Sequence, residues 1–358
     1  MKSIFDLANS GEVTPAELGY YFPAEFAPHT ATWLSWPHKE ESWPGKIETV
    51  YPAYAAFIKI VAQGEMVNIN VSNEAMKAFA LTHLENAGVD LSQIKFHFFP
   101  TNDAWCRDHG PAFLINPNAA EAKAVVKWNY NAWGDKYPPY DLDNLIPHKI
   151  ADHLGVPCFT PNIVMEGGSV EFNGAGTLLT SKACLLNKNR NPNLNQAQIE
   201  KYLCDYYGVS NILWVGDGIL GDDTDGHIDD ITRFVNQDTV LTVVEENRLD
   251  ENHLILKENL QLLRDMRLED GKQLNIVELP MPGAKFYEDQ RLPASYANFY
   301  IANEAVIVPT FKDKNDQKAI DIISGCFADR QVVGVDSLDI IWGLGSFHCL
   351  SQQEPAVV

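Results

Sequence analysis

The chain has 358 residues, of which 46% are hydrophobic and 11% aromatic, so it can form a large buried core and is not expected to be disordered. Its formal net charge of -21 disfavours nucleic acid as a partner, because phosphate contacts require clustered Lys and Arg. The first residues show no secretory signal and no apolar run is long enough to cross a bilayer, so we expect a cytoplasmic protein with no membrane partner.

The cysteines do not predict a metal site or a disulfide framework. None of the six forms a C-x-x-C pair, which argues against structural zinc. Most lie in apolar surroundings and are expected to be inert core residues, with Cys349 as the exception discussed below.

Taken in chain order, the first two predicted units are the less regular ones. The first comprises a strand at Thr32–Trp36, a helix near Tyr51–Ala62, a strand at Met66–Val71 and a second helix near Asn73–Asn86 that Gly88 caps. The second comprises strands at Ala112–Ile115 and Ala124–Trp128, a short helix near Leu145–Leu154 and a strand at about Val156–Phe159.

Three later units repeat the order strand, strand, helix, strand more clearly. The third has strands at Val170–Phe172, Thr177–Thr180 and Ile212–Val215, with a helix near Asn195–Tyr207 between Asn195 as N-cap and Gly208 as C-cap. The fourth has strands at Ile231–Val235, Thr239–Val244 and Leu274–Leu279 and a helix after Asp250. The fifth has strands at Phe299–Ile301, Ala305–Val308 and Val332–Val335 and a helix after Asp316.

Five similar α/β units favour a closed, pseudo-symmetric ring. A single unit cannot bury its apolar face alone, so neighbouring units stack and closure removes the exposed ends. The alternative is an ordinary α/β sheet with accidental similarity, since the units share negligible sequence identity.

Polar residues gather at the junctions between these units, in segments 101–111, 166–168, 221–230 and 343–355. Equivalent junctions of a ring converge on its axis, so the clusters are expected to share one site. Because that site would draw on residues from 108 to 349, we expect residues 1–358 to form a single domain.

Cys349 is the candidate nucleophile of this site. A reactive cysteine needs an accessible thiolate and a nearby base, and Cys349 lies in a glycine-flanked tail that is not required to pack tightly. His348 is a poor partner, because adjacent strand residues point to opposite faces. His227 is the better one, since Asp225 and Asp229 flank it and can orient its ring and raise its basicity.

Several carboxylates accompany these two residues, and buried acids repel one another unless a cation compensates them. The junction segments contribute Asp108, Glu166, Asp223, Asp225 and Asp229. The segment around His227 lacks the spacing of an EF-hand loop, so calcium fits poorly. A guanidinium fits better, because its planar N–H groups pair with carboxylates and its carbon can accept a thiolate.

Each residue also has a structural interpretation. Asp108 could pair with Arg107, Glu166 could cap a turn, and His227 and Cys349 could be ordinary core residues. Each of these structural interpretations is reasonable alone. It is far less plausible that all four residues, which lie at corresponding junctions, have only structural roles.

The motifs together resemble those of agmatine deiminases, which belong with the Porphyromonas-type peptidylarginine deiminases among the guanidine-modifying enzymes. The similar segments cover nearly the whole chain: Pro23-Ala-Glu-Phe, Thr32-Trp-Leu-Ser-Trp36-Pro37, 102–111, Glu166-Gly-Gly168, 185–192, 223–229, Asn298-Phe-Tyr and 345–355. The resemblance implies a five-bladed α/β propeller, the pentein fold, in agreement with the five units.

The resemblance also implies roles for matching positions. Cys349 would be the nucleophile and His227 the general acid and then the general base. Asp108 and Asp229 would grip the guanidinium, and Glu166 would orient His227. Trp105 would line the pocket, and the residues expected at the far end of the substrate are Asp223, Asp225 and Trp133.

The implied reaction converts agmatine to N-carbamoylputrescine and ammonia through a covalent amidino-thioether on Cys349, a step of putrescine biosynthesis. It needs no metal and no cofactor, its only partner being a small cationic substrate, and a homodimer is the candidate assembly. The alternatives are a deiminase of free or peptidyl arginine, an amidinotransferase, and a non-catalytic polyamine binder. A metal-dependent hydrolase is a more distant alternative.

Overall fold

The computed structural model describes residues 3–358, and its sheets repeat one strand pattern. Among these residues, five of the six sheets contain an antiparallel pair of strands followed by a parallel neighbour. In each of these five sheets a helix connects the two parallel strands, as the crossover between parallel strands requires. The fold is therefore a mixed α/β fold, and the predicted order of elements is confirmed in every unit.

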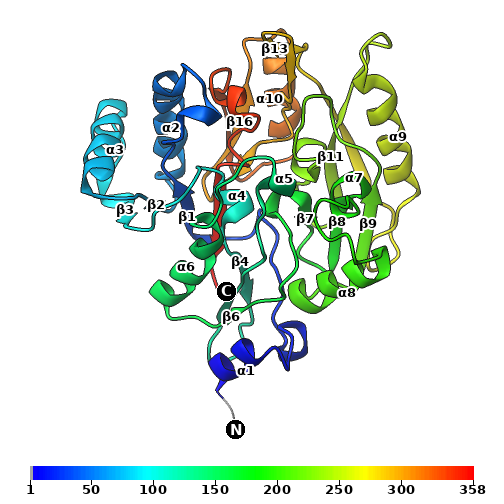
Figure 1. Ribbon diagram of the computed structural model, residues 1–358. Helices are drawn as coiled ribbons and strands as arrows, with labels where there is room; N and C mark the ends of the chain where they lie inside the picture. The colour runs from blue at the N-terminus through cyan, green and yellow to red at the C-terminus, as the bar shows by residue number, and fades with distance from the viewer. Residues whose placement is uncertain (1–2) are drawn as a thin grey trace.

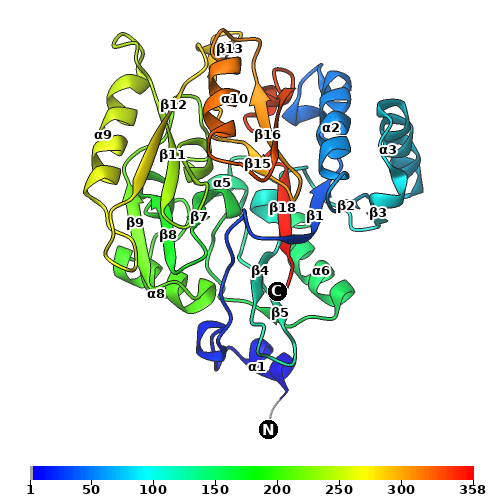
Figure 2. The ribbon, with the colours of Figure 1, turned by 180° about the vertical axis from the view of Figure 1, so that it is seen from behind.

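The first sheet joins the two ends of the chain. Its strand order is β18-β1-β2-β3, with β1 (His29–Ser35), β2 (Met66–Asn70), β3 (Ile94–His97) and β18 (Ser351–Pro355). The C-terminal strand β18 runs antiparallel to β1, which supplies the strand that sequence analysis did not find for this unit. Helices α2 (Ile47–Val61) and α3 (Glu74–Ala87) belong to the same unit. Figure 2 shows β18 beside β1 near the middle of the molecule.

The second and third sheets follow the predicted boundaries closely. The second contains β4 (Ala112–Ile115), β5 (Lys123–Val126), β6 (Cys158–Phe159) and helix α6 (Ile146–Leu154). The third contains β7 (Val170–Phe172), β8 (Thr177–Ser181), β9 (Asn211–Val215) and helix α8 (Gln196–Tyr207). The Asn195 side chain caps α8 in a capping box, and Gly208 ends it in the left-handed conformation, as the sequence predicts.

The fourth and fifth sheets complete the series. The fourth contains β10 (Thr232–Phe234), β11 (Thr239–Val244), β12 (Asn275–Pro280) and helix α9 (Asn252–Asp265). The fifth contains β15 (Tyr300–Ile301), β16 (Ala305–Thr310), β17 (Gln331–Asp336) and helix α10 (Asp316–Ser324). The hairpin of β13 (Lys285–Tyr287) and β14 (Gln290–Leu292) and strand β3 were not predicted, because each strand has only three or four residues, too few to establish a periodic pattern.

The longer helices lie toward the rim, whereas the short helices α4 (Cys106–His109) and α5 (Ala132–Asp135) lie near the centre (Figure 1). The remaining short helices are α1 (Ile4–Ser10) and α7 (Lys182–Leu185). No helix among residues 3–358 combines the length and the apolar character needed to span a bilayer.

The C-terminal tail differs from its prediction. Every residue of β18 is buried and Cys349 is 6% exposed, so this segment packs tightly. The expectation of a loosely packed tail was wrong, because pairing with β1 draws the segment into the interior.

Candidate active site

Cys349 lies in a turn directly before β18, which places its thiol at a cavity wall. The Asn298 side-chain amide donates to Cys349 Sγ at 3.0 Å, and the Asp229 Oδ2 atom lies 3.6 Å from the same sulfur. The Cys349 carbonyl accepts from the Arg107 backbone N–H at 3.1 Å. Burial raises the pKa of the thiol well above its usual value, and nearby Asp229, Asp230 and Asp108 raise it further. A cation at the thiol would favour the reactive thiolate.

Asp108, in α4, is held by two hydrogen bonds. Its Oδ1 atom accepts from the Gly168 N–H at 2.9 Å, and its Oδ2 atom accepts from Trp133 Nε1 at 2.9 Å. Burial raises the pKa of Asp108 to about 6, although His227 opposes the shift. Its carboxylate is therefore well placed for a cationic ligand.

The loop that carries Trp133 adopts an uncommon backbone conformation. Ala132, Trp133 and Asp135 all have positive φ values, between 48° and 61°, and Gly134 has a φ of 90°. Such conformations cost free energy in non-glycine residues and persist where tertiary contacts impose them. Here the bond from Trp133 to Asp108 is one such contact.

His227 is fully buried directly before the turn Ile228–Asp230. Its backbone N–H donates to Asp222 Oδ2 at 3.0 Å, and its Nδ1 atom lies 3.8 Å from Asp108 Oδ1. Burial disfavours the imidazolium, but the Asp108 carboxylate together with Cys184 and Asp229 outweighs it and raises the pKa of His227 well above its usual value. Among residues 3–358, neither ring nitrogen has a partner at hydrogen-bond geometry, although the Cys184 thiol lies within 4.8 Å of the ring. The ring is therefore free to donate a proton to a bound molecule.

Glu166 lies behind His227. Its Oε1 atom accepts from Arg190 Nε at 2.6 Å, whereas its buried Oε2 atom has no partner within the described part of the chain. Possible ligand atoms of Glu166, His227 and Cys184 all lie within 4.8 Å of one another. Cys184, expected to be an inert core residue, therefore borders the site.

Gly168 explains the Glu-Gly-Gly motif. A Cβ atom at this position would lie 2.6 Å from His227 Nδ1, 3.0 Å from Asp108 Oδ1 and 3.1 Å from Asp229 Oδ2. Only glycine leaves room for these three groups to converge.

A cavity of about 880 Å³, which includes part of its open mouth, leads to this cluster. Its lining includes Cys349, Asp108, Trp105, Trp133 and Asp223, which the sequence predicted for the site. Trp105 packs on Trp43, with ring centroids 5.3 Å apart, and meets the Trp133 ring edge-on. These aromatic walls suit the apolar stem of a ligand.

Asp223 and Asp225 occupy different surroundings. Asp223 lines the cavity and accepts a hydrogen bond from the Tyr137 hydroxyl. Asp225 does not belong to the lining, because its oxygens accept from Arg190, Asn189 and Lys136. Asp225 and Asp229 were expected to orient the His227 ring, and this stays a prediction; the carboxylate that pairs with the ring is Asp108, with its Oδ1 atom 3.8 Å from Nδ1.

Sequence reasoning assigned no role to four residues that contact this cluster. Asn298 binds the Cys349 sulfur and accepts from the His348 N–H at 3.1 Å. His348 and Glu25 extend the network behind Asp229, and Cys184 approaches His227. Asn298 and Glu25 both occur in segments singled out for their resemblance to deiminases, but their type alone indicates no chemistry.

Two sets of three side chains bring possible metal ligands within 4.8 Å of one another: Glu166, Cys184 and His227, and Asp229, Asp230 and Cys349. Both sets are parts of the cluster already described, and we assign neither as a metal centre.

Comparison with known proteins agrees with this geometry. The family model of the Porphyromonas-type peptidyl-arginine deiminases matches residues 21–355. The agmatine deiminase of Pseudomonas syringae pv. tomato is 34% identical over 366 residues, covering 96% of this chain and 97% of its own.

Solved structures are similar over the same length. The agmatine deiminase of Enterococcus faecalis superposes with a TM-score of 0.90 at 33% identity, covering 97% of this chain and 98% of its own. A variant agmatine deiminase of C. jejuni with substrate bound gives a TM-score of 0.85 at 31% identity, covering 94% and 96%. An amidinotransferase of Microseira wollei shares the fold alone, with a TM-score of 0.50 at 13% identity, covering 94% and 98%. The chain therefore belongs to the Porphyromonas-type peptidyl-arginine deiminase family.

Proposed function

We propose that the protein hydrolyses agmatine to N-carbamoylputrescine and ammonia. The observation that carries this proposal is a set of buried polar atoms in the Cys349–Asp108–His227 cluster that have no hydrogen-bond partner among residues 3–358: Asp229 Oδ1, Glu166 Oε2 and both ring nitrogens of His227. Buried polar groups are normally hydrogen-bonded, so such a set marks the place of a ligand. A planar guanidinium offers several donors to these acceptors and an electrophilic carbon to the thiol.

In the proposed reaction, Asp108 and Asp229 bind the guanidinium, whose charge lowers the cost of forming the Cys349 thiolate. The sulfur adds to the guanidinium carbon, His227 protonates one nitrogen, and the C–N bond breaks to release ammonia. An amidino-thioether remains on Cys349. His227 then deprotonates water, which attacks the same carbon, and the C–S bond breaks to give a ureido group and the free thiol.

Glu166 is proposed to keep the His227 ring in position for both proton transfers. Its own position is set by Arg190, which is fully buried at the side chain and bonded to Glu166 on one side and to Asp225 on the other. Asp225 therefore supports the site through Arg190 in this proposal and does not touch the substrate.

The far end of the cavity favours a substrate that ends in an amine. Asp223 and Asp103 line it, and the Lys39 ammonium is already paired with Asp103 at 3.4 Å. Arg107, which could have bound a substrate carboxylate, pairs with Glu25 instead. An arginine carboxylate would therefore lack a free cation among the described cavity residues, whereas the agmatine amine finds Asp223.

The test is an ammonia-release assay that compares agmatine, free arginine and blocked arginine peptides. We expect a kcat/KM for agmatine at least roughly 100-fold above that for arginine, because desolvating an unpaired carboxylate costs several kcal/mol. A higher kcat/KM with arginine or with an arginine peptide would instead support the alternative function, deimination of arginine.

We further propose that the five units form a five-bladed pseudo-symmetric propeller and that residues 1–358 act as one domain, because segments next to all five of these sheets contribute groups to one site. A cytoplasmic homodimer stays a prediction, which light scattering and cell fractionation would test.

A further inference from the structure

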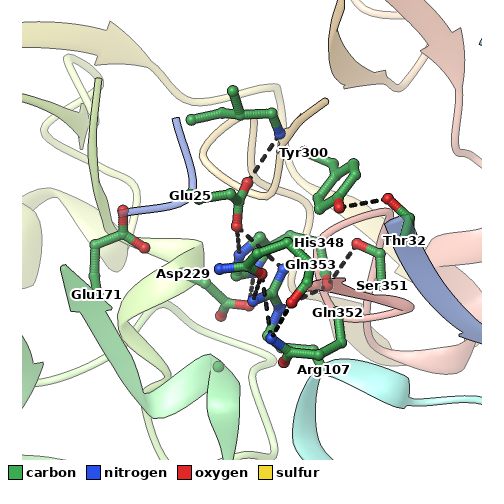
Figure 3. A network of polar contacts seen from close by, with 12 residues as sticks. Glu25, Thr32, Arg107, Glu171, Asp229, Tyr300, His348, Ser351, Gln352 and Gln353 are labelled. Atoms are coloured by element: carbon green, nitrogen blue, oxygen red, sulfur yellow. Dashed lines mark hydrogen bonds and ion pairs between the residues drawn. The ribbon is translucent and has the colours of Figure 1, made fainter. Parts of the chain in front are cut away.

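We propose that Glu25 is a positioning residue of the active site, which acts through His348 to hold the Asp229 carboxylate and leave its Oδ1 atom free for the substrate. The inference rests on the proposed role of Asp229 in gripping the guanidinium. Glu25 lies in the segment before β1, far from the catalytic motifs in sequence. Figure 3 shows it at the centre of a buried polar network.

Glu25 accepts four hydrogen bonds from four segments of the chain. Its Oε1 atom accepts from Arg233 Nη2 and from the Ile301 N–H, both at 2.9 Å. Its Oε2 atom accepts from Arg107 Nη2 at 3.1 Å and from His348 Nε2 at 2.7 Å. Only 5% of the surface of residue Glu25 is exposed, so these bonds are shielded from water.

His348 links this carboxylate to Asp229. Its Nδ1 atom lies 2.7 Å from Asp229 Oδ2, while its Nε2 atom lies 2.7 Å from Glu25 Oε2 (Figure 3). An ionised carboxylate can only accept, so both ring nitrogens donate and the ring is an imidazolium. With that charge, three cations face three carboxylates in the network: Arg107, Arg233 and His348 against Glu25, Glu171 and Asp229.

The two oxygens of Asp229 are consequently different. Oδ2 is occupied by His348 and lies 3.6 Å from the Cys349 sulfur, whereas Oδ1 is buried without a partner. The network also holds the nucleophile's backbone, since Arg107 donates from Nε to the His348 carbonyl at 3.3 Å and from its N–H to the Cys349 carbonyl.

The groups that face Asp229 carry both signs. The cations are His348, Arg233 and His227, and the acids are Asp108, Asp222, Asp230 and the Cys349 thiol. Burial alone would raise the pKa of Asp229, but His348, followed by His227 and Arg233, outweighs it and lowers that pKa. Asp108 is also buried, but its imidazole neighbour His227 lies 3.8 Å away and does not reach hydrogen-bond distance, and the pKa of Asp108 is raised to about 6.

Glu25→Gln removes one of the two carboxylates that hold the His348 ring between them. A ring that no longer bonds Asp229 leaves that carboxylate with a higher pKa, so Asp229 is protonated at a pH where the wild type still has the anion. We expect kcat/KM at pH 7 to fall roughly 10- to 100-fold, the value of a charge-assisted hydrogen bond, and the acid limb of its pH profile to move to higher pH. The assay uses whichever guanidinium compound the wild type turns over fastest, so failure of the agmatine assignment is seen separately.

Glu171→Gln is the matched control. Glu171 is also buried and also pairs with Arg233, but its hydrogen bonds go to Arg233 Nε and the Phe234 N–H and not to His348. Both variants should lose stability, whereas only Glu25→Gln should shift the acid limb. An unchanged limb in folded Glu25→Gln, or an equal shift in Glu171→Gln, would overturn the proposal. If Glu25→Gln does not fold, the test uses His348→Gln, which keeps a hydrogen-bond donor for Asp229 but removes the charge. A shift of the acid limb of the kcat/KM profile in this variant supports the proposal, and an acid limb like that of the wild type overturns it.

Discussion

The two sides of Asp229 differ in how completely their polar groups are paired. On the substrate side, buried atoms of Glu166, His227 and Asp229 have no hydrogen-bond partner. On the rear side, every oxygen of Glu25 and both ring nitrogens of His348 are paired. A second, smaller cavity borders the rear side, with a volume of about 530 Å³ that includes its open mouth, and its lining includes Glu25, Arg107 and His348.

The contrast separates two kinds of buried charge. Unpaired buried groups lower stability and are retained where a ligand completes them, whereas paired groups fix geometry. Substitutions on the substrate side should therefore cost activity more than stability, and substitutions on the rear side should cost both.

The largest effect is expected for Cys349→Ser. A hydroxyl is far less acidic than a thiol and of similar volume, so turnover should fall at least roughly 1000-fold with the fold retained. Ammonia release and circular dichroism measure the two properties. The control is Cys326→Ser, since the half-buried Cys326 thiol lies just after α10, where it donates to the Ile322 carbonyl, outside the cluster around Cys349. Comparable activity of Cys349→Ser and the wild type would exclude covalent catalysis.

Asp108→Asn should lower kcat/KM by roughly 100-fold through the loss of charge-assisted bonds to the substrate. The pKa of Asp108 is raised to about 6, so its anion predominates above that pH and the wild-type kcat/KM should fall as the pH drops through about 6. Thermal unfolding provides the contrast: Asp108→Asn should lower Tm only modestly, because the amide loses one of the two hydrogen bonds that Asp108 accepts but removes the cost of burying an ionised carboxylate. A large loss of Tm would place Asp108 with the paired, rear-side groups.

Asp223→Asn should have a smaller effect, which depends on the substrate. The Asp223 carboxylate lines the cavity and is proposed to meet the amine of agmatine, so its neutralisation should raise KM for agmatine by roughly 10-fold. A guanidine without the terminal amine should be affected much less. Tyr137→Phe serves as a control that removes the hydroxyl bonded to Asp223 while leaving the charge. Equal losses for both substrates would contradict the proposed contact.

Dialysis against EDTA should leave the rate unchanged. Asp229, Asp230 and Cys349 lie close enough to share a cation, but the proposed reaction assigns Cys349 and Asp229 to the substrate. Ammonia release is measured before and after dialysis and after adding back single divalent ions. Activity that is lost and then restored by one ion would favour a metal-dependent hydrolase.

Local structure was accessible from the sequence because short-range rules govern it. The Asn195 and Gly208 caps of α8 and the strands Val170–Phe172 and Thr239–Val244 were predicted with their observed bounds. The cysteine, the histidine and the Glu-Gly-Gly segment indicated the chemistry, because few combinations of side chains can attack a guanidinium.

Contacts between distant segments were decided only by the tertiary structure. The pairing of β18 with β1 joins residues more than three hundred positions apart and buries the tail that carries Cys349. The same arrangement turns Arg107 away from Asp108 toward Glu25, ties Asp225 to Arg190, and brings His348 between two carboxylates. No periodicity or cap encodes such contacts, since they depend on how five sheets pack against one another. The sequence by itself therefore determined the elements and the reactive groups, while packing determined which carboxylate is paired and which is left for the substrate.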